Sequence, residues 1–188
     1  MIIKQIPNLI TVSRLLLLPL LIFFLWDGNY TYGHYALIVF IVIGLGDLVD
    51  GYLARKLNAE SNTGKILDPM VDKMALLVCI IMFLYLGRLN PIIAMLILSR
   101  EIIVITLRAV AAGEGIVIHA SNEAKRKTAL QNFGLACLMV YPIFLGCDMA
   151  YCGNFLLILS IIASWYSLTI YLINFIPHWK QKMSKDDQ

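Results

Sequence analysis

The chain has 188 residues, of which 60% are hydrophobic and 14% charged, and its mean hydropathy is +0.80. A soluble domain averages about 45–50% apolar and 25% charged residues, so the composition excludes an ordinary soluble protein and predicts an integral membrane protein. The net charge of +3 fits basic side chains that face anionic lipid headgroups. No motif indicates nucleic-acid binding, and the four cysteines lack metal-ligand spacing.

Six apolar runs follow one another along the chain. Each is long enough to cross roughly 30 Å of hydrocarbon as a helix of about 20 residues. Their limits are residues 9–26, 35–57, 66–87, 91–112, 128–147 and 154–176. Little chain remains for a soluble domain, and neither an internal repeat nor a linker divides it. We therefore predict an all-α, polytopic membrane protein with six transmembrane helices in one domain, residues 1–188.

The basic residues predict how these helices are oriented. Residues 1–11 lack the features of a cleavable signal peptide, so we expect the first apolar run to remain in the mature protein. Lysines and arginines cluster near both termini and around the connections after the second and fourth runs, while Arg88 falls on the opposite side. Cytoplasmic loops carry the excess of such residues. Both termini are therefore expected in the cytoplasm, with the protein in the inner (cytoplasmic) membrane.

Four aspartates stand where the second run ends and the third begins. Asp47 and Asp50 are three residues apart, and Asp68 and Asp72 are four apart, so each pair shares one helix face. A charge in a membrane span costs about 2.5–3.5 kcal/mol on insertion scales, which marks it as a functional candidate. Because the two helices are antiparallel and closely connected, we expect the four carboxylates to converge in the inner third of the bilayer.

Such a cluster of anions requires positive charge to neutralise it. Hard oxygen ligands favour Mg²⁺ or Mn²⁺, and a pair of bridged ions is a recurrent device for displacement at phosphorus. Gly51 leaves room for a ligand close to the backbone, and Arg55 offers a guanidinium suited to phosphate. The pattern therefore predicts metal-dependent chemistry of the phosphoryl-transfer type, with two ions.

The same stretch carries a resemblance to a known family. The segments DLVDGYLAR at 47–55 and GKILDPMVD at 64–72 resemble the signature of the CDP-alcohol phosphotransferase family at every fixed position, and the six-helix plan agrees with that family. Residues 6–11 with Arg14, 99–108 and 125–128 also resemble the branch whose acceptor is sn-glycerol 3-phosphate. The resemblance thus extends over most of the chain.

The resemblance implies a fold, a reaction and a set of site residues. It implies a CDP-alcohol phosphotransferase fold, transfer of the phosphatidyl group of CDP-diacylglycerol to an alcohol with release of CMP, and a homodimer. Asp72 would be both a metal ligand and the catalytic base. The other implied metal ligands are Asp47, Asp50 and Asp68. The residues implied to hold the CDP-diacylglycerol headgroup are Asn8, Thr11, Gly51, Arg55 and Ser61.

An acceptor site follows from the remaining cations. Glycerol 3-phosphate is a dianion, and basic residues near apolar helices would form its phosphate pocket, namely Arg100, Arg108, Lys125 and Lys127. An alternative for Arg100 is a structural pairing with a carboxylate such as Glu101 or Asp72. The alternative for Lys125 and Lys127 is an interaction with anionic lipid at the end of a helix.

Three other classes of membrane protein share some of these features: other members of the same family, prenyltransferases and transporters. Cardiolipin synthases with the same signature use phosphatidylglycerol, and other members use serine or inositol phosphate. Membrane prenyltransferases combine aspartate-rich motifs with Mg²⁺ but have a different aspartate pattern. A transporter would also bury charges, but would leave the signature unexplained. We therefore expect the transferase that gives phosphatidylglycerophosphate in phospholipid biosynthesis.

Overall fold

Helices make up nearly all of the protein. The computed structural model describes residues 6–56, 62–113, 122–144 and 146–186. The helices are α1 Ile6–Leu25, α2 Tyr30–Lys56, α3 Asn62–Tyr85, α4 Pro91–Gly113, α5 Asn122–Met139 and α6 Met149–Asp186. The strands β1 Ile143–Phe144 and β2 Cys147–Asp148 pair antiparallel between α5 and α6. The prediction of a helical membrane-type chain is confirmed at this level.

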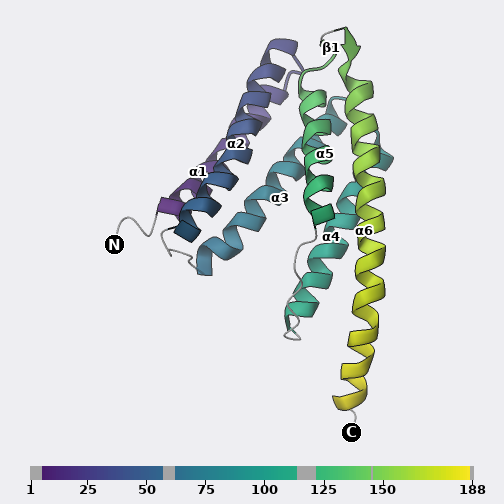
Figure 1. Ribbon diagram of the computed structural model, residues 1–188. Coiled ribbons are helices and arrows are strands. Elements are labelled where there is room, and N and C mark those ends of the chain that lie inside the picture. The colour runs from purple at the N-terminus through teal and green to yellow at the C-terminus, as the bar shows by residue number, and fades with distance from the viewer. Residues whose placement is uncertain (1–5, 57–61, 114–121, 145, 187–188) are drawn as a thin grey trace.

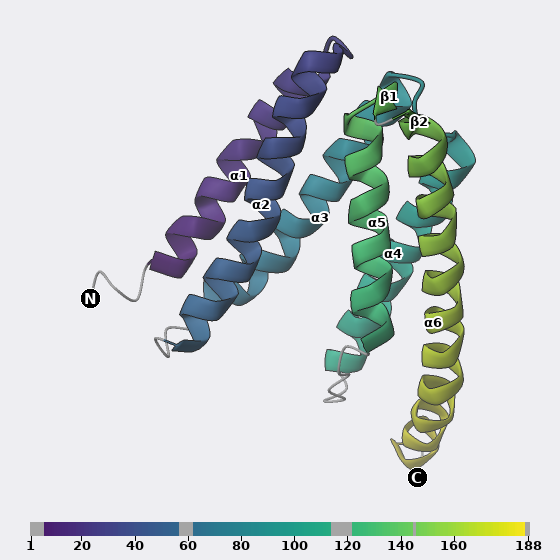
Figure 2. The same ribbon diagram turned by 45° about the horizontal axis from the view of Figure 1, so that its top comes forward.

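The helices alternate in direction. The first residues of α1, α3 and α5 lie at the same end of the molecule as the last residues of α2, α4 and α6 (Figure 1). α1 packs against α2 and α3, while α6 packs against α5 and α4. In the rotated view α1, α2 and α3 again lie together, apart from α4, α5 and α6 (Figure 2). The two signature-bearing helices, α2 and α3, therefore belong to the same half of the bundle.

Side-chain caps explain where two of the helices begin. Asn90 Oδ1 accepts a hydrogen bond of 2.9 Å from the amide of Ile92, and Pro91 occupies the first position of α4. Asp148 Oδ1 accepts one of 2.9 Å from the amide of Ala150 at the start of α6. Asn and Asp are preferred caps because their oxygens satisfy amides that lack a partner within the helix, and proline is favoured at the first position.

The structure corrects the boundaries of the fifth predicted helix. The apolar run at 128–147 was expected to be one continuous span, but α5 ends at Met139, and the two short strands follow. Pro142 has no amide hydrogen, and a residue that precedes proline is disfavoured in the helical conformation. The apolar residues Ile143 and Phe144 are exposed in β1. Hydropathy alone did not reveal this interruption.

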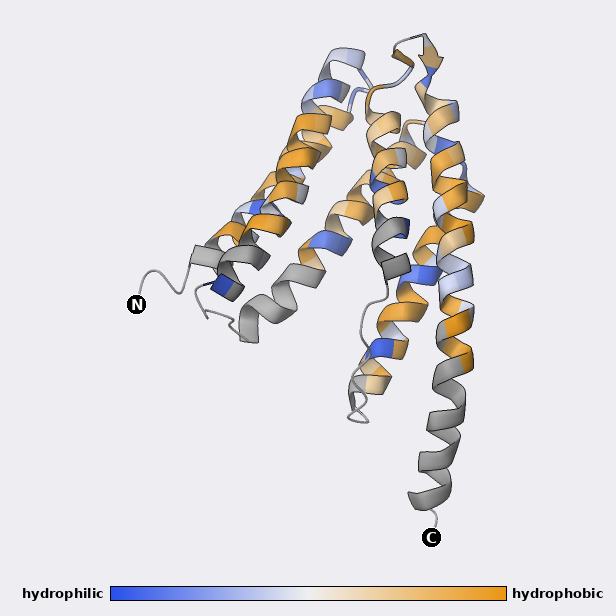
Figure 3. Cartoon of the chain, viewed as in Figure 1, coloured by the Kyte–Doolittle hydropathy of each residue, from blue (hydrophilic) through white to orange (hydrophobic). Residues whose placement is uncertain are grey.

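Apolar residues predominate along the described helices (Figure 3). By length and composition, Tyr30–Val49 and Met149–Ile170 are able to cross a membrane, and Ile10–Leu25 is a shorter apolar helix. Large apolar side chains such as Leu16 and Phe23 are exposed, and extensive exposed apolar surface is characteristic of contact with lipid or a partner. These features agree with a membrane protein.

Arg88, in the connection between α3 and α4, contacts the connection between α1 and α2, the connection between α5 and α6, and the ends of α5 and α6. Its guanidinium donates to the carbonyl of Gly28 at 2.6 Å and to that of Leu138 at 3.0 Å, and it lies 4.7 Å from the centre of the Tyr141 ring. Asn154 of α6 donates to the Arg88 carbonyl at 2.9 Å. The buried arginine thus satisfies backbone groups of several helix ends at once.

α5 and α6 approach each other closely because both have glycine at the contact. A Cβ added at Gly153 would lie 2.8 Å from Leu138 Cδ2 and 2.9 Å from the carbonyl oxygen of Gly134. A Cβ added at Gly134 would lie 3.0 Å from the carbonyl oxygen of Gly153. Small residues of this kind let helix backbones pack directly in membrane proteins.

Replacement of Gly153 by alanine should therefore destabilise the protein. We expect Gly153→Ala to cost about 1–3 kcal/mol, the range typical of overpacking, and to lower the midpoint of thermal unfolding in detergent. Gly44→Ala on α2 is the matched control, since its added Cβ would meet no atom within 4 Å. Equal unfolding midpoints for the two variants would contradict this account of the α5–α6 contact.

Candidate active site

Asp47 and Asp72 are the two predicted metal ligands whose side chains the structure describes. They stand on α2 and α3, and the Asp72 carboxylate interacts electrostatically with Asp47, Arg14, Lys73 and Glu101. The exposed fractions of the two aspartate side chains are 44% and 50%. Both carboxylates are therefore accessible to an incoming ligand while they share one electrostatic environment.

Several other expected site residues fall outside this description. Asp50 lies in α2 and Asp68 in α3, but their side chains are beyond the described part, so the convergence of four carboxylates stays a prediction. The same holds for the side chains of Asn8, Arg55 and Lys125, and Ser61 lies outside the described residues altogether.

Thr11 and Gly51, both expected at the donor headgroup, are described. Thr11 is buried within α1. Gly51 lies in α2, one turn beyond Asp47, and a Cβ added there would meet no atom within 4 Å in the described structure. Gly51 therefore presents no side chain one turn beyond Asp47 on α2.

Arg14 reaches the aspartate site from α1. Its side chain, 2% exposed, lies across Gly46, where an added Cβ would be 2.8 Å from Arg14 Cδ. Arg14 Nη1 donates to Asp47 Oδ1 at 3.0 Å. The glycine makes room for the arginine, and the arginine orients the carboxylate. Sequence reasoning did not assign Arg14 to the site, although a basic residue within an apolar run was a signal for it.

A second charged cluster surrounds Glu101 on α4. Lys73 Nζ on α3 donates to Glu101 Oε2 at 2.6 Å, and Arg100 Nη1 donates to Glu101 Oε1 at 3.1 Å. Lys127 Nζ on α5 donates to the same Oε1 atom. The side chains of Glu101 and Lys127 are only 8% and 6% exposed. Buried charges of this kind require partners with good hydrogen-bond geometry, and here one carboxylate serves three cations.

Lys73 connects the two clusters. Its ammonium group lies 3.8 Å from Asp72 Oδ2 as well as 2.6 Å from Glu101 Oε2. Lys73 was not predicted to be a site residue, and Glu101 was expected only as a partner for Arg100. Two signals were present: Lys73 directly follows the last signature aspartate, and Glu101 is a carboxylate within the apolar run 91–112.

Of the four residues expected to bind the acceptor phosphate, two lie in the Glu101 cluster. Arg100 makes the pairing with Glu101 that was its alternative explanation, and Lys127 shares that carboxylate. Arg108 is exposed on α4, seven residues beyond Glu101, and has no ion pair among the residues that the structure describes. Two of the four are thus brought together by a residue that was not predicted to be in the site.

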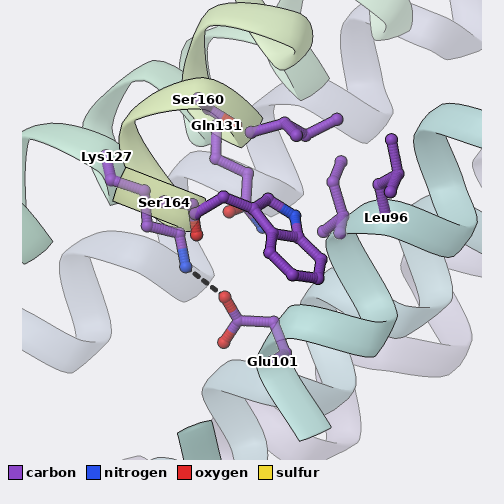
Figure 4. Close-up of a pocket in the computed structure, with 9 residues that line it drawn as sticks. Leu96, Glu101, Lys127, Gln131, Ser160 and Ser164 are labelled. Carbon is purple, nitrogen blue, oxygen red and sulfur yellow. Dashed lines mark hydrogen bonds and ion pairs between the residues drawn. The ribbon is translucent and has the colours of Figure 1, made fainter. Parts of the chain in front are cut away.

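A recess between α4, α5 and α6 adjoins the Glu101 cluster (Figure 4). Lys127 and Glu101 form one wall, while Gln131, Ser164 and Trp165 contribute further polar groups. Ser164 is buried, and neither its Oγ atom nor Trp165 Nε1 has a hydrogen-bond partner within the described structure. The recess thus places two unsatisfied donors near the Lys127–Glu101 ion pair.

The donor set at the first cluster fits a divalent cation. Asp47 and Asp72 supply accessible carboxylate oxygens, the ligands that Mg²⁺ and Mn²⁺ prefer. Arg14 and Lys73 already bring positive charge to these two groups. The described residues contain no group of three possible metal ligands, and the side chains of Asp50 and Asp68 are not among them.

Comparison with known proteins defines the class to which this helical, carboxylate-bearing chain belongs. Residues 4–174 match the family described as CDP-alcohol phosphatidyltransferase. Because the match covers most of the chain, the protein belongs to this family, as the signature had indicated.

Curated relatives agree with this assignment. A protein from Rickettsia felis is 34% identical over 137 residues, which is 73% of this chain and 76% of the relative. A protein from Aquifex aeolicus is 30% identical over 176 residues, 93% of both chains. One from Bacillus subtilis is 34% identical over 151 residues, 74% and 78% of the two chains. All three are named CDP-diacylglycerol–glycerol-3-phosphate 3-phosphatidyltransferase.

The different burial of Lys127 and Lys73 predicts that their removal will destabilise the protein to different extents. Lys127→Met should destabilise the protein by about 3 kcal/mol, because the loss of one partner weakens the compensation of a buried charge. Lys73→Met should cost less than about 1 kcal/mol, since the Lys73 side chain is 39% exposed and solvent-exposed pairs contribute little. Thermal unfolding in one detergent measures both. A larger loss for Lys73→Met would contradict the proposed difference.

Proposed function

We propose that this protein transfers the phosphatidyl group of CDP-diacylglycerol to sn-glycerol 3-phosphate, which yields phosphatidylglycerophosphate and CMP. Membership of the CDP-alcohol phosphatidyltransferase family and the names of the relatives support this reaction. The observation that carries the choice of acceptor is the set of cations around Glu101, which Lys73 connects to Asp72. A neutral alcohol would have no use for such a set, whereas a phosphate monoester would.

The acceptor phosphate is assigned to the basic residues of α4 and α5. Lys127 and Arg100 lie in one cluster, and Lys125 and Arg108 complete the proposed set. Arginine suits bidentate contact with phosphate, and lysine acts as a point charge. The acceptor's hydroxyl would then lie toward Asp72, because Lys73 spans the two clusters.

Asp72 is the proposed base. It accepts the proton of the acceptor hydroxyl as that oxygen attacks the phosphorus that bears diacylglycerol. The new phosphorus–oxygen bond forms while the bond to CMP breaks, and CMP leaves with the electron pair. No residue of the chain becomes covalently modified in this direct displacement. The proposed contacts to the donor headgroup are Asn8, Thr11, Gly51, Arg55 and Ser61.

The four signature aspartates are proposed to hold the divalent metal, Mg²⁺ or Mn²⁺, in a two-ion arrangement. The residues are Asp47, Asp50, Asp68 and Asp72. When bound, the metal supplies positive charge for the phosphate oxygens and for the leaving CMP. Arg14 keeps Asp47 oriented through the contact at 3.0 Å, so that this carboxylate is held in place before the metal arrives.

The proposed enzyme is a single six-span domain, and it works as a homodimer in the inner membrane, with both termini in the cytoplasm. The two apolar helical stretches that qualify as spans support the membrane assignment, and the distribution of basic residues supports the orientation. A site at the cytoplasmic side suits the substrates, because the acyl chains stay in lipid while glycerol phosphate arrives from water.

The acceptor can be tested directly. We expect purified protein with Mg²⁺ to release CMP from CDP-diacylglycerol when sn-glycerol 3-phosphate is added, but not with phosphatidylglycerol, serine or inositol phosphate. Asp72→Asn should lower the rate by about 10²–10⁴-fold, the range typical of a lost general base. Asp27→Asn, an exposed residue in the α1–α2 turn, is the matched control and should retain the wild-type rate.

Two results would change the proposal. Preference for another acceptor would assign a different reaction within the same family. A folded Asp72→Asn protein with wild-type activity would remove Asp72 from the role of base.

The metal requirement leads to a separate expectation. Removal of divalent ions by EDTA should abolish CMP release, because the charge on the phosphate oxygens and the leaving group is then not neutralised. Added Mg²⁺ or Mn²⁺ in excess should restore the rate, and Ca²⁺, with its looser coordination, should restore less. Full activity in the presence of excess chelator would contradict a metal-dependent displacement.

A further inference from the structure

We infer that Glu101 is a positioning residue for the acceptor: it holds Lys73, Arg100 and Lys127 as a preassembled site for a phosphate monoester and sets the net charge of that site. The inference rests on the proposed function and deepens it. None of its steps requires Glu101 to touch the reacting atoms.

The first step is geometric. The three cations come from different helices, with Lys73 on α3, Arg100 on α4 and Lys127 on α5, and all three contact the one carboxylate. Long basic side chains carry about 2 kcal/mol of rotamer entropy. A fixed central carboxylate therefore restricts where their donor groups lie before any ligand binds, and preorganisation of this kind favours binding.

The second step is the charge of the cluster. Three cations and the Glu101 carboxylate leave two positive charges within the cluster itself, with Asp72 at 3.8 Å from Lys73 on its edge. A phosphate monoester carries close to two negative charges at pH 7, so the arriving acceptor would neutralise the site. Without Glu101 the same three cations would repel one another at short distance.

The third step is the presence of unused donors. The buried Ser164 Oγ and Trp165 Nε1 line the recess beside Glu101 and Lys127 and have no hydrogen-bond partner among the described residues. Figure 4 shows Ser164 next to the Lys127–Glu101 ion pair. An unsatisfied buried donor costs about 1–3 kcal/mol, and the recess is too narrow for a water molecule to satisfy either one.

The fourth step connects this cluster to the chemistry. Lys73 lies 3.8 Å from Asp72 Oδ2, the proposed base. When Lys73 moves from Glu101 toward the acceptor phosphate, it exchanges one charge-assisted hydrogen bond for another of similar strength. The new hydrogen bond to phosphate thus compensates for the lost Lys73–Glu101 bond. A phosphate bound to Lys73 would place the acceptor near Asp72.

The test compares the Michaelis constants of the two substrates in full-length protein. Glu101→Gln should raise KM for sn-glycerol 3-phosphate at least about tenfold and change KM for CDP-diacylglycerol less than about twofold, since only acceptor binding is affected. Glu101→Asp, which keeps the charge, should recover part of the loss. Thr106→Ala, on the same helix but outside the cluster, is the matched control and should leave both constants unchanged.

A binding measurement makes the outcome independent of turnover. sn-Glycerol 3-phosphate should raise the thermal unfolding midpoint of the wild type, because a ligand that binds only the folded state stabilises it. The same concentration should raise that of Glu101→Gln much less. If the wild type gains more stability than Glu101→Gln but releases no CMP, the proposed function fails while the phosphate-binding role of the Glu101 cluster stands.

Three results would overturn the inference itself: an unchanged or lower KM for glycerol 3-phosphate in Glu101→Gln, equal changes in both Michaelis constants, or equal thermal shifts in the two proteins. If Glu101→Gln does not fold, Glu101→Asp carries the test. Its shorter side chain withdraws the carboxylate from the lysines, so an unchanged KM for glycerol 3-phosphate would contradict the positioning role.

Discussion

The pairing of buried charge is the constraint on which this structure depends. In a bundle of apolar helices an unpaired cation is costly, and each one must find an acceptor. Each buried basic side chain in the described part has such an acceptor, in a carboxylate or in backbone carbonyls. These residues are Arg14, Arg88, Arg100 and Lys127. Their partners fix how α1, α3, α4 and α5 are placed, so the same interactions determine the packing and the site.

The group that accepts the hydrogen bond distinguishes cations that hold the fold from those proposed to bind the substrate. Arg88 donates to the backbone carbonyls of Gly28 and Leu138, which belong to the fold and cannot leave. Arg100 and Lys127 donate to a carboxylate side chain, and an anionic ligand offers them an equivalent acceptor. Exchange between a carboxylate and a phosphate oxygen keeps the charge-assisted hydrogen bond. In the proposed acceptor site, the Glu101 cluster would therefore bind and release a phosphate while the backbone contacts of Arg88 stay in place.

The sequence was sufficient to predict that the chain is mostly helical and that Asp47 and Asp72 stand on consecutive helices, because both depend on short-range patterns. The end of α5 at Met139 was missed, since hydropathy outweighed Pro142. The Glu101 cluster was missed for another reason. Lys73 and Lys127 are 28 and 26 residues from Glu101, and their contacts depend on how three helices rotate and pack. Arg14 was likewise unassigned, because its path across Gly46 exists only once α1 and α2 are packed together.

The contact between Lys73 and Glu101 has a further consequence for the reaction. α2 and α3 carry the aspartates and α1 carries Arg14, whereas α4 and α5 carry the other residues of the Glu101 cluster. Donor and acceptor would thus be held by different halves of the bundle, and Lys73 is an ion-pair link between them, at 3.8 Å from Asp72 and 2.6 Å from Glu101. Because Lys73 is partly exposed, its pairing is weaker than that of Lys127. A phosphate that binds between the halves would compete first for this lysine, which places the acceptor beside the base.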